Sequence, residues 1–334
     1  MQQQLLFWYR RHKRDLPWRR TKDPYRIWVS EIMLQQTTVE TVIPYYHRFL
    51  ERFPTVRSLG RAREESVLRL WSGLGYYSRA RNLHSAAKIL IADVTRSLAT
   101  FPKTATDWQQ LPGVGRTTAG AIVSIAFDQR APILDGNVIR VLSRVFAIED
   151  HPKTGHGQKI FWRKSEEILP QKNCGDFNQA LMELGATVCH VTNPACPDCP
   201  LSSFCLARKE GQMESYPRGR GKTVYRNVLM SAAMVRRNGS FLMVRRPDKG
   251  SLKKMWEFPM VEGNLHKLVK AFPVIPQKEL PIVRHAVMNR RLTIAPYLCT
   301  LVSSKGMRSS RWIAKKSVLA LPTSSMNLKL ARLF

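Results

Sequence analysis

Apolar residues recur at helical spacing over most of the first 215 positions, and strand-like alternation begins only in the last third of the chain. There, Asn227 to Val235 and Phe241 to Arg245 are predicted to form two strands. Arg237-Asn238-Gly239-Ser240 lies between them, and its Asn-Gly pair favours a tight hairpin turn. The pattern predicts a mainly α protein, with a large helical domain followed by a smaller α+β domain.

A segment rich in Gly, Pro and cations separates these two regions. Tyr216-Pro217-Arg218-Gly219-Arg220-Gly221-Lys222 is typical of an exposed linker. We therefore expect a helical domain at 1–214, a basic linker at 215–225 and an α+β domain at 226–334. A length of 334 residues with 44% hydrophobic content is enough for each domain to bury its own core.

Positive charge dominates the chain, with a formal net charge of +30. Residues 231–334 alone contain 20 Lys and Arg against 4 Asp and Glu. A solvated basic face without a ligand is one interpretation, but charge of this size favours a polyanion such as DNA through counterion release. No run of about 18 apolar residues and no secretory N-terminus is found, so we expect a cytoplasmic monomer, associated with the nucleoid if bacterial, with no membrane partner.

Four cysteines stand at the spacing C-x6-C-x2-C-x5-C: Cys189, Cys196, Cys199 and Cys205. Interleaved prolines make this segment a ligand loop more readily than a core element. Four thiolates bind a structural zinc ion or an iron–sulfur cluster, and the spacing alone leaves both open. The alternatives without a metal are disulfides or four unrelated buried thiols. Cys174 and Cys299 lie far away and are expected to be plain buried residues.

Two glycine-rich turns interrupt the helical pattern. Leu111-Pro112-Gly113-Val114-Gly115-Arg116 separates the predicted helices Ala105 to Gln110 and Thr118 to Phe127, as in a helix-hairpin-helix element. Its backbone N–H groups would bind a phosphate at the positive end of the second helix. Gly73-Leu74-Gly75-Tyr76-Tyr77 is a second such turn, where Tyr76 could wedge into a base stack. The alternative for the first turn is a tight helix connection with packing glycines, and the alternative for the second is a tyrosine that belongs to the core beside a helix start.

Two carboxylates in contrasting settings are the candidate catalytic groups. Asp23-Pro24 predicts a helix start, and the helix to about Gln36 surrounds Glu31 with apolar residues that would raise its pKa. Asp135 precedes a helix and would stay ionised as its N-cap. A carboxylic acid with a raised pKa and an ionised carboxylate together suit cleavage of a glycosidic bond. A solvated Glu31 and a purely structural cap at Asp135 remain open from these residues alone.

Five motifs in order before the cysteines closely resemble the adenine DNA glycosylases of the MutY family. The resemblance covers about residues 5–210 and, more faintly, the remainder. The motifs are Leu16-Pro17-Trp18-Arg19, Trp28-Val29-Ser30-Glu31-Ile32-Met33-Leu34-Gln35-Gln36-Thr37, Gly73-Leu74-Gly75-Tyr76-Tyr77, Leu111-Pro112-Gly113-Val114-Gly115 and Leu134-Asp135-Gly136-Asn137-Val138. The resemblance implies a two-lobed helical glycosylase fold and a [4Fe-4S] cluster on the four cysteines.

The resemblance also implies a role for each matching position. Glu31 would protonate the departing adenine, Asp135 would stabilise the sugar cation or its covalent adduct, and Asn137 would support this pair. The positions that line the adenine pocket in the family are Trp18, Arg19 and Glu183. The positions that contact the duplex are Gln36, Tyr76 and, in the hairpin, Leu111, Gly113, Gly115 and Arg116. The implied substrate is double-stranded DNA with adenine opposite 8-oxoguanine or guanine.

Two other functions compete with this interpretation. Endonuclease III shares the hairpin, the aspartate and the cluster, but acts on oxidised pyrimidines through a lysine at the position of Thr117. Because Thr117 has no amine, Schiff-base strand cleavage is not expected and base removal should be monofunctional. A non-catalytic DNA-binding protein with a structural cluster is the second alternative, and the presence of both carboxylates argues against it.

The C-terminal part resembles the MutT-like (Nudix-like) lesion-recognition domain of the same family. Met255-Trp256-Glu257-Phe258-Pro259 fits a stretch that is typical of it, and no run of paired glutamates for nucleotide hydrolysis follows. The chain departs from the family where a Phe-Ser-His triplet is usual, because Val287-Met288-Asn289 stands there. We therefore expect a weaker preference for 8-oxoguanine over guanine than is usual in the family.

Overall fold

The computed structural model of the chain describes residues 1–92, 101–219, 224–248, 252–303, 307, 309–318 and 321–334. Two compact units make up the chain. The first contains Met1–Arg61 and Asn82–Gly221, and the second contains Ala62–Arg81 and Lys222–Phe334. A short piece of the helical region therefore belongs to the same unit as the C-terminal third.

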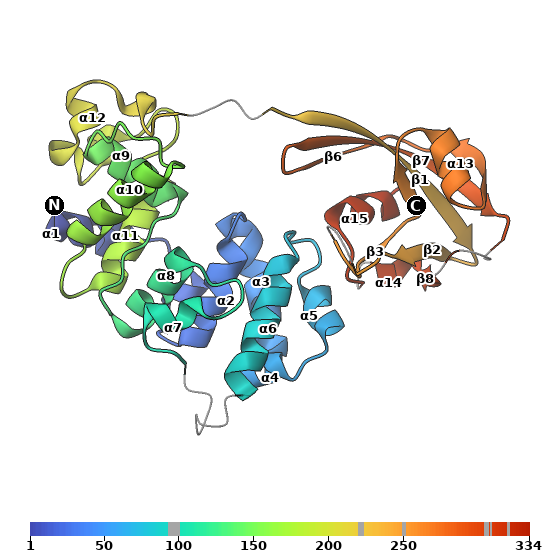
Figure 1. The fold of residues 1–334 in the computed structure, drawn as a ribbon, viewed down its shortest axis with the longest axis horizontal. Helices are drawn as coiled ribbons and strands as arrows, with labels where there is room; N and C mark the ends of the chain where they lie inside the picture. The colour runs from blue at the N-terminus through green and yellow to red at the C-terminus, as the bar shows by residue number, and fades with distance from the viewer. Residues whose placement is uncertain (93–100, 220–223, 249–251, 304–306, 308, 319–320) are drawn as a thin grey trace. The chain divides into compact units, whose positions relative to one another are not determined.

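The region before residue 215 is helical, as the apolar spacing predicts (Figure 1). Its α-helices are α1 Gln2–His12, α2 Pro24–Leu34, α3 Val39–Arg52, α4 Val56–Gly60, α5 Glu64–Leu70, α6 Ser78–Ala92, α7 Ala105–Gln109, α8 Arg116–Phe127, α9 Gly136–Val145, α10 Gly155–Glu167, α11 Cys174–Thr187 and α12 Leu206–Lys209. Its 3-10 turns are η1 Pro17–Arg19, η2 Cys196–Asp198, η3 Ser202–Phe204 and η4 Met213–Ser215.

The predicted start of α2 is confirmed, and its end is two residues earlier than expected. Asp23 is the N-cap, and its side chain accepts a hydrogen bond from the Tyr25 N–H at 2.8 Å. The helix ends at Leu34 because the chain turns there, and Gln36 has a left-handed φ of 59°. Buried side chains on α2 include Trp28, whose ring meets Trp108 edge to face at 5.5 Å.

Helices α8 and α11 pack closely at the centre of the first unit. The approach requires glycine, since a Cβ built on Gly175 would lie 2.4 Å from the Ser124 carbonyl oxygen. At the far end of α8, Asp128 has a left-handed φ of 52° and accepts hydrogen bonds from the N–H groups of Asn173 and Gly175. Its carboxylate thereby ties the end of α8 to the start of α11.

The C-terminal region contains a sheet and small helices, as predicted. The strands are β1 Arg226–Arg237, β2 Ser240–Arg245, β3 Trp256–Glu257, β4 Met260–Glu262, β5 Val274–Glu279, β6 Val283–Val287, β7 Arg290–Leu301 and β8 Ser310–Ala314. The helices are α13 Leu265–Ala271, α14 Lys315–Val318 and α15 Ser325–Ala331.

Strand β1 is the centre of this sheet. The order is β3-β2-β1-β7-β5, with β4 on β1, β6 on β7 and β8 on β2. Strands β1 and β7 run parallel, and β1 and β2 form the expected antiparallel hairpin with Asn238 and Gly239 in left-handed conformations at its turn. The two faces of the sheet bury separate clusters, one around Phe241 and Phe258 and one around Val235 and Leu268.

The predicted linker is not exposed at its start. Tyr216 is only 1% exposed, and its hydroxyl donates to the Glu149 carboxylate. Arg218 pairs with the same carboxylate through two nitrogens, and His151 bonds to the Gly219 carbonyl. Composition missed these contacts because they depend on a partner about 70 residues earlier. Residues 220–223 of the predicted linker lie outside the described part of the chain.

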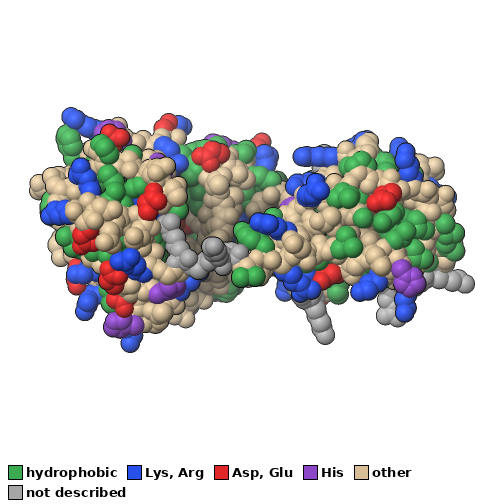
Figure 2. All heavy atoms as spheres, turned by 90° about the horizontal axis from the view of Figure 1, so that it is seen from above, with side chains coloured by type: hydrophobic (Ala, Val, Ile, Leu, Met, Phe, Trp, Pro, Cys, Tyr) green, Lys and Arg blue, Asp and Glu red, His purple; other side chains and the backbone are tan. Residues whose placement is uncertain are grey.

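Basic side chains are visible over both parts of the chain in Figure 2, and acidic ones are few on the face shown of the C-terminal part. This distribution follows from the sequence, in which residues 231–334 have five times as many cations as carboxylates. Within the part of the chain that the structure describes, no helix is long and apolar enough to cross a membrane.

Candidate active site

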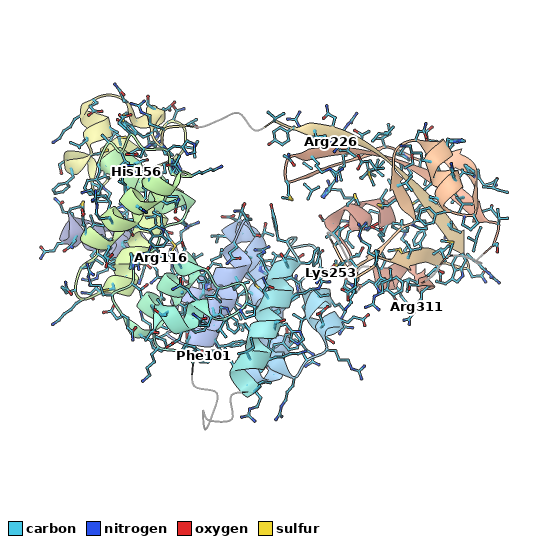
Figure 3. The ribbon with its side chains drawn as sticks, in the orientation of Figure 1. Phe101, Arg116, His156, Arg226, Lys253 and Arg311 are labelled. Atoms are coloured by element: carbon cyan, nitrogen blue, oxygen red, sulfur yellow. The ribbon has the colours of Figure 1, made fainter. Side chains whose placement is uncertain are left out.

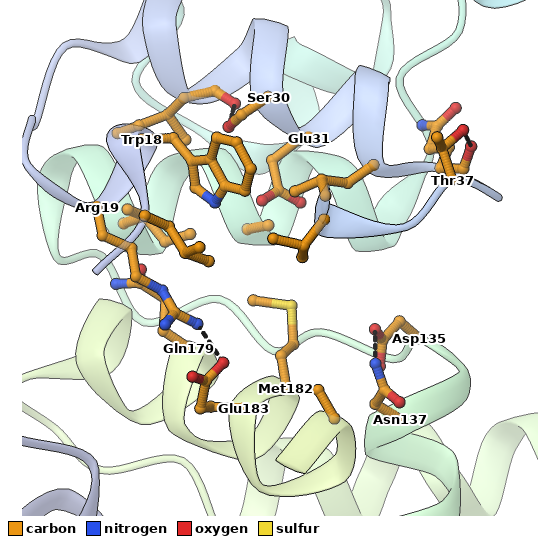
Figure 4. Close-up of a pocket in the computed structure, with 18 of the residues that line it drawn as sticks. Trp18, Arg19, Ser30, Glu31, Thr37, Asp135, Asn137, Gln179, Met182 and Glu183 are labelled. Carbon is orange, nitrogen blue, oxygen red and sulfur yellow. Dashed lines mark hydrogen bonds and ion pairs between the residues drawn. The ribbon is translucent and has the colours of Figure 1, made fainter. Parts of the chain in front are cut away.

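A cavity of about 470 Å³ lies in the first unit among α2, α8, α9 and α11 (Figure 4). It is large enough to enclose a nucleobase, since pockets of ~300–1,000 Å³ hold ligands of drug size. All six residues that were predicted to be catalytic or base-binding line it: Trp18, Arg19, Glu31, Asp135, Asn137 and Glu183. Positions separated by more than 150 residues in the sequence are thus brought to one cavity.

Glu31 lies on α2, and its carboxylate is directed into the cavity (Figure 4). The pKa of this carboxyl is raised from 4.5 to about 7, chiefly by burial and also by the negative charge of Asp135, while Arg19 partly opposes the rise. Its neighbours Ile32 and Met33 are fully buried, which is the apolar setting the sequence predicts. A carboxyl in this state keeps its proton near neutral pH and can donate it.

Asp135 is the N-cap of α9, as predicted. Its carboxylate accepts the Val138 N–H at 2.7 Å. Burial raises the pKa of Asp135, whereas hydrogen bonds from Val138 and Asn137 and the charge of Arg140 lower it. The sequence had suggested that its position as N-cap keeps Asp135 ionised, but burial of the carboxyl opposes this effect. Burial is the largest of these effects, so the pKa of Asp135 lies above its ordinary 3.8, and the hydrogen bonds and Arg140 offset only part of the rise.

Asn137 links Asp135 to the cysteine loop through Arg140. Its amide nitrogen is 3.5 Å from the Asp135 carboxylate, and its amide oxygen accepts from Arg140 at 2.8 Å. Arg140 also donates to the carbonyls of Gly185 at 2.6 Å and Cys189 at 2.7 Å. The orientation of Asn137 is therefore fixed by groups on α9, on α11 and at the first predicted metal ligand.

Glu183 is a fully buried carboxylate between two arginines. Arg14 contributes its backbone N–H at 2.8 Å, its Nε at 3.0 Å and a terminal nitrogen at 2.8 Å, and Arg19 contributes a terminal nitrogen at 2.7 Å. Burial would raise the pKa of Glu183, but the hydrogen bonds from Arg14 and Arg19 lower it to about 2. Its acceptor sites are thus used by the two arginines, and it orients Arg19 at the edge of the cavity.

Trp18 presents its indole to the cavity and is held edge to face against Tyr46 at 5.4 Å. Arg14, Gln179 and Met182 are among the lining residues that sequence reasoning missed. Gln179 is one helical turn before Glu183 on α11, so the i, i+4 spacing was the signal that could have found it. Arg14 left no such signal, because its partner is 169 residues away.

Thr117 occupies the cavity wall at the position where a lyase would carry its amine. Its hydroxyl donates to the Leu134 carbonyl at 3.0 Å, next to Asp135. Among the described residues, no lysine lines the cavity. The chain therefore offers carboxyl groups, an indole and guanidinium groups at this site, and no amine nucleophile.

The predicted hairpin at Leu111 to Gly115 is a tight turn between α7 and α8. Gly113 has a φ of 80°, and a Cβ on it would lie 2.7 Å from that of Asn82. Gly115 is the N-cap of α8 without a side-chain cap, so the first N–H groups of the helix are open. Leu111 is buried, and Arg116 lies 3.9 Å above the ring of Trp162 (Figure 3).

The two predicted duplex contacts Gln36 and Tyr76 lie in different units. Gln36 is exposed in the turn after α2. Tyr76 is 46% exposed with a φ of 49°, and the guanidinium of Arg79 lies 5.5 Å from its ring. Neither side chain belongs to the cavity, and both are accessible to a partner.

The four cysteines of the predicted ligand set line one small cavity beside α9 and α11. Arg144, which is buried, donates to the Cys189 sulfur at 3.2 Å and to the carbonyl of His190 at 2.6 Å. Burial raises the pKa of Cys199 to about 11, and the charges of the other three cysteines act in the same direction. Within the described ranges, no three His, Cys, Asp or Glu side chains form a group that could hold a single metal ion.

Family models match both regions of the chain. Residues 29–167 match the HhH-GPD superfamily of base excision DNA repair proteins, and residues 231–333 match the NUDIX domain. The first match contains Glu31, Asp135 and the hairpin. The second covers the sheet and its helices, where the described strands and the match begin within a few residues of each other.

Curated relatives are similar over most of the chain. Adenine DNA glycosylase of Arabidopsis thaliana is 41% identical over 77% of this chain, which spans only 46% of that protein's length. Adenine DNA glycosylase of Buchnera aphidicola (subspecies Schizaphis graminum) is 35% identical over 92% of this chain and over 90% of its own length. The rat enzyme is 35% identical over 99% of this chain and 77% of its own.

Solved structures agree with the helical fold. A thermostable thymine-DNA glycosylase superposes with a TM-score of 0.57 at 29% identity, covering 62% of this chain and 94% of its own. A trapped endonuclease III–DNA covalent intermediate superposes with a TM-score of 0.53 at 22% identity, covering 63% and 94%. The second likeness supports the fold alone.

The fold and the paired carboxyls define a base excision repair glycosylase of the helix-hairpin-helix class with a Nudix-like domain. The chain belongs to the adenine DNA glycosylase family, because curated members of that family are 35% identical to it over more than 90% of its length. The family resemblance, the fold class and the enzyme class expected from the sequence are confirmed.

Glu31→Gln should make the protein more stable at alkaline pH. The pKa of Glu31 in the folded protein, about 7, exceeds the ordinary 4.5, so the folded state binds this proton more tightly. The stability that protonated Glu31 contributes to the wild type is therefore lost as the pH rises from 4.5 to 7, and none of this contribution remains above pH 7. Because glutamine does not ionise, we expect a gain of about 2–3 kcal/mol at pH 8 and almost none at pH 4.5. Urea unfolding at both pH values measures it; equal differences would contradict the desolvation of Glu31.

Glu183→Gln should destabilise the protein, because it leaves two guanidinium groups facing a neutral amide in a buried site. We expect a loss of about 2–4 kcal/mol in the free energy of unfolding. The control is Glu167→Gln, whose pairs with Lys164 and Arg163 are at the surface and should contribute little. Chemical denaturation of the three proteins at neutral pH measures both effects. Similar losses in the two variants would show that Glu183 has no special role.

Proposed function

We propose that this protein removes adenine from DNA mispairs by hydrolysing the bond between the base and the sugar, through Glu31 and Asp135. The observation that carries this proposal is the pair of carboxyls on one cavity, one of which has a pKa of about 7. A protonated carboxyl that shares a cavity with a second carboxyl is the arrangement that cleavage through an oxocarbenium-like transition state requires.

Glu31 is the general acid of this proposal. As the bond between C1′ and the adenine nitrogen breaks, the bonding electrons leave with the base, and a ring nitrogen of the base takes the proton of Glu31. Neutral adenine is a far better leaving group than its anion. The raised pKa of Glu31 supports this role, because an ordinary glutamate would already have lost its proton at neutral pH.

Asp135 provides the negative charge that the sugar cation needs. It either stabilises the cation electrostatically or adds to C1′ and is then displaced by water. The water supplies the oxygen of the abasic site, and its proton returns to the Glu31 carboxylate. Hydrogen bonds from Val138 and Asn137 support an ionised Asp135 with fixed orientation. Asn137 and Arg140 act on the reaction by holding this carboxylate in place.

Recognition of the base is assigned to the other side of the cavity. Trp18 offers an aromatic face for stacking, and Arg19, held by Glu183, offers guanidinium donors to a base edge. A base in a duplex cannot reach this enclosed acid, so the nucleotide must be flipped out of the helix. Phosphate contacts at Gly113 to Arg116, and contacts of Gln36 and Tyr76 with the duplex, would offset the unstacking cost.

Base removal without strand cleavage is supported by the composition of the cavity wall. A lyase forms a Schiff base between an amine and C1′, and Thr117 donates its hydroxyl to a carbonyl at the corresponding position. Because the described lining contains no lysine, hydrolysis by water is the reaction that these residues can perform.

The four cysteines are proposed to hold a [4Fe-4S] cluster. All four line one cavity, and Arg144 donates to one of the sulfurs, which favours a thiolate. The cluster would be bound by Cys189, Cys196, Cys199 and Cys205 and would act as a structural support for this loop. Arg140, which contacts both the Cys189 carbonyl and Asn137, would transmit that support to the carboxyl pair.

The C-terminal domain is proposed to span 226–334 and to contact the strand opposite the adenine. The β6–β7 turn presents Met288, which is 75% exposed with a φ of 53°. Arginines flank this turn, and Arg226 and Arg290 share the carboxylate of Glu262. An apolar tip among cations favours contacts with the backbone and stacking over hydrogen bonds to a lesion. The opposing base would be 8-oxoguanine or guanine.

Base release tests the central proposal. A duplex with adenine opposite 8-oxoguanine should lose adenine, with strand breaks only after alkali, whereas a thymine glycol duplex should stay intact. Glu31→Gln should abolish release but preserve duplex binding. In the wild type the rate should fall about tenfold per pH unit above pH 7, as Glu31 loses its proton. Cuts at thymine glycol without alkali, or full activity of Glu31→Gln, would contradict the proposal.

The preference for 8-oxoguanine over guanine opposite the adenine should be small, and it should rise when the β6–β7 turn is altered. The variant carries three changes, Val287→Phe, Met288→Ser and Asn289→His. We compare the single-turnover rate for adenine opposite 8-oxoguanine with the rate for adenine opposite guanine. The ratio of the two rates should increase by about tenfold in the variant, because one added hydrogen-bonded contact with a base has about this effect. Val302→Ser, at another exposed apolar position, is the control. An unchanged ratio would show that this turn does not read the opposing base.

Cluster binding can be measured on the purified protein. The wild type should contain iron and inorganic sulfide in equal amounts, and Cys199→Ser should lose both because one thiolate ligand is removed. Cys174→Ser, at a buried cysteine outside the set, should retain them. Zinc in place of iron, or an iron content that Cys199→Ser leaves unchanged, would exclude this cofactor.

A further inference from the structure

The turn from Gly73 to Tyr77 belongs to the same unit as the C-terminal third of the chain, and two hydroxyl groups connect them. The Ser72 hydroxyl and the Tyr77 hydroxyl both donate to the backbone carbonyl of Thr323, the former at 3.0 Å. Thr323 is completely buried, and Tyr77 is only 4% exposed. Two side chains therefore share one carbonyl that is shielded from water, which strengthens both hydrogen bonds.

This turn has an unfavourable backbone conformation that needs support. Gly73, Gly75 and Tyr76 have φ values of 96°, 77° and 49°. For a tyrosine the left-handed conformation costs about 1 kcal/mol or more, so it persists only where neighbouring contacts determine it. The Tyr77 hydroxyl is such a contact, because it accepts the Gly73 N–H at 3.2 Å while it donates to Thr323.

The Thr323 carbonyl is itself fixed by the sheet. The Thr323 hydroxyl donates to the Trp256 carbonyl at 2.6 Å, and the Trp256 N–H donates to the Pro322 carbonyl at 2.9 Å. Ser324 begins α15, where Asn327 accepts the Phe258 N–H at 3.0 Å. A second connection nearby runs from Arg81 to the Lys253 carbonyl. The turn is thus attached to strand β3 through Thr323, and Arg81 attaches the start of α6 to the segment before β3.

We propose that Tyr77 is a positioning residue, which uses the buried Thr323 carbonyl of the C-terminal domain to hold Tyr76 in the conformation that enters the duplex. This inference rests on the proposed contact of Tyr76 with the duplex. It assigns to the C-terminal domain a part in extruding adenine, in addition to contact with the opposite strand. The ring of Tyr76 is exposed and has Arg79 beside it. Its direction therefore depends on the backbone conformation of the turn, which the hydroxyl of Tyr77 holds.

The test is a double-mutant cycle on single-turnover base release with Tyr76→Ala, Tyr77→Phe and both changes together. Tyr77→Phe keeps the buried ring and removes only the hydroxyl. We expect a rate decrease of about three- to tenfold for Tyr77→Phe, the effect of one or two hydrogen bonds. In the Tyr76→Ala background the second change should have no further effect, since the residue it positions is gone. Ser72→Ala should act in the same direction and less strongly.

A second substrate separates positioning from a general loss of structure. On a duplex in which the target adenine is bulged and already unstacked, Tyr77→Phe should regain the wild-type rate, because extrusion is no longer needed. The matched control Tyr297→Phe, elsewhere in the same unit, should keep the wild-type rate on both duplexes. The thermal unfolding midpoints of all variants are compared.

The outcomes distinguish two failures. Defects that multiply in the double variant, or an equal defect of Tyr77→Phe on the bulged duplex, would overturn the positioning role while leaving the enzyme assignment intact. A wild-type rate for Tyr76→Ala would instead remove the proposed duplex contact of Tyr76, and the positioning role with it.

Discussion

The carboxyl of Glu31 must lose most of its contact with water and still face a second carboxyl, and the helical unit is organised around that requirement. Burial, with the charge of Asp135, brings its pKa to about 7. Such a group destabilises the fold at alkaline pH, so the surrounding helices must be held by other contacts. The close approach of α8 and α11 at Gly175, and the capping of α9 by Asp135, are two of them.

Charge compensation is the second recurring device. Glu183 would be costly in the interior without Arg14 and Arg19, and with them it ties the segment before α2 to α11 across 169 positions of sequence. Arg140 and Arg144 do the same for α9 and the cysteine loop, using carbonyls and one sulfur as acceptors. Arg14 and Arg19 line the cavity, whereas Arg140 and Arg144 connect α9 to the end of α11 and to the cysteine loop.

The motifs and short-range patterns made much of the fold and site predictable. The Asp23-Pro24 start of α2, the Asn238-Gly239 hairpin, and a helical region followed by a sheet all follow from local conformational preferences, which act within a few residues. Glu31 and Asp135 were found because an apolar neighbourhood and an N-cap are local as well. The cysteine set was found from spacing, although spacing did not choose its metal.

By itself, the sequence determined the elements, the basic character of the chain and the two candidate carboxyls. Only the tertiary structure decided that burial also raises the pKa of Asp135, that Glu183 is saturated by two arginines, that Arg14 and Gln179 line the cavity, and that Tyr216 is buried. Each of these depends on a partner tens to hundreds of residues away. Local periodicity contains no record of such distant pairs, because desolvation and ion pairing depend on distance in space.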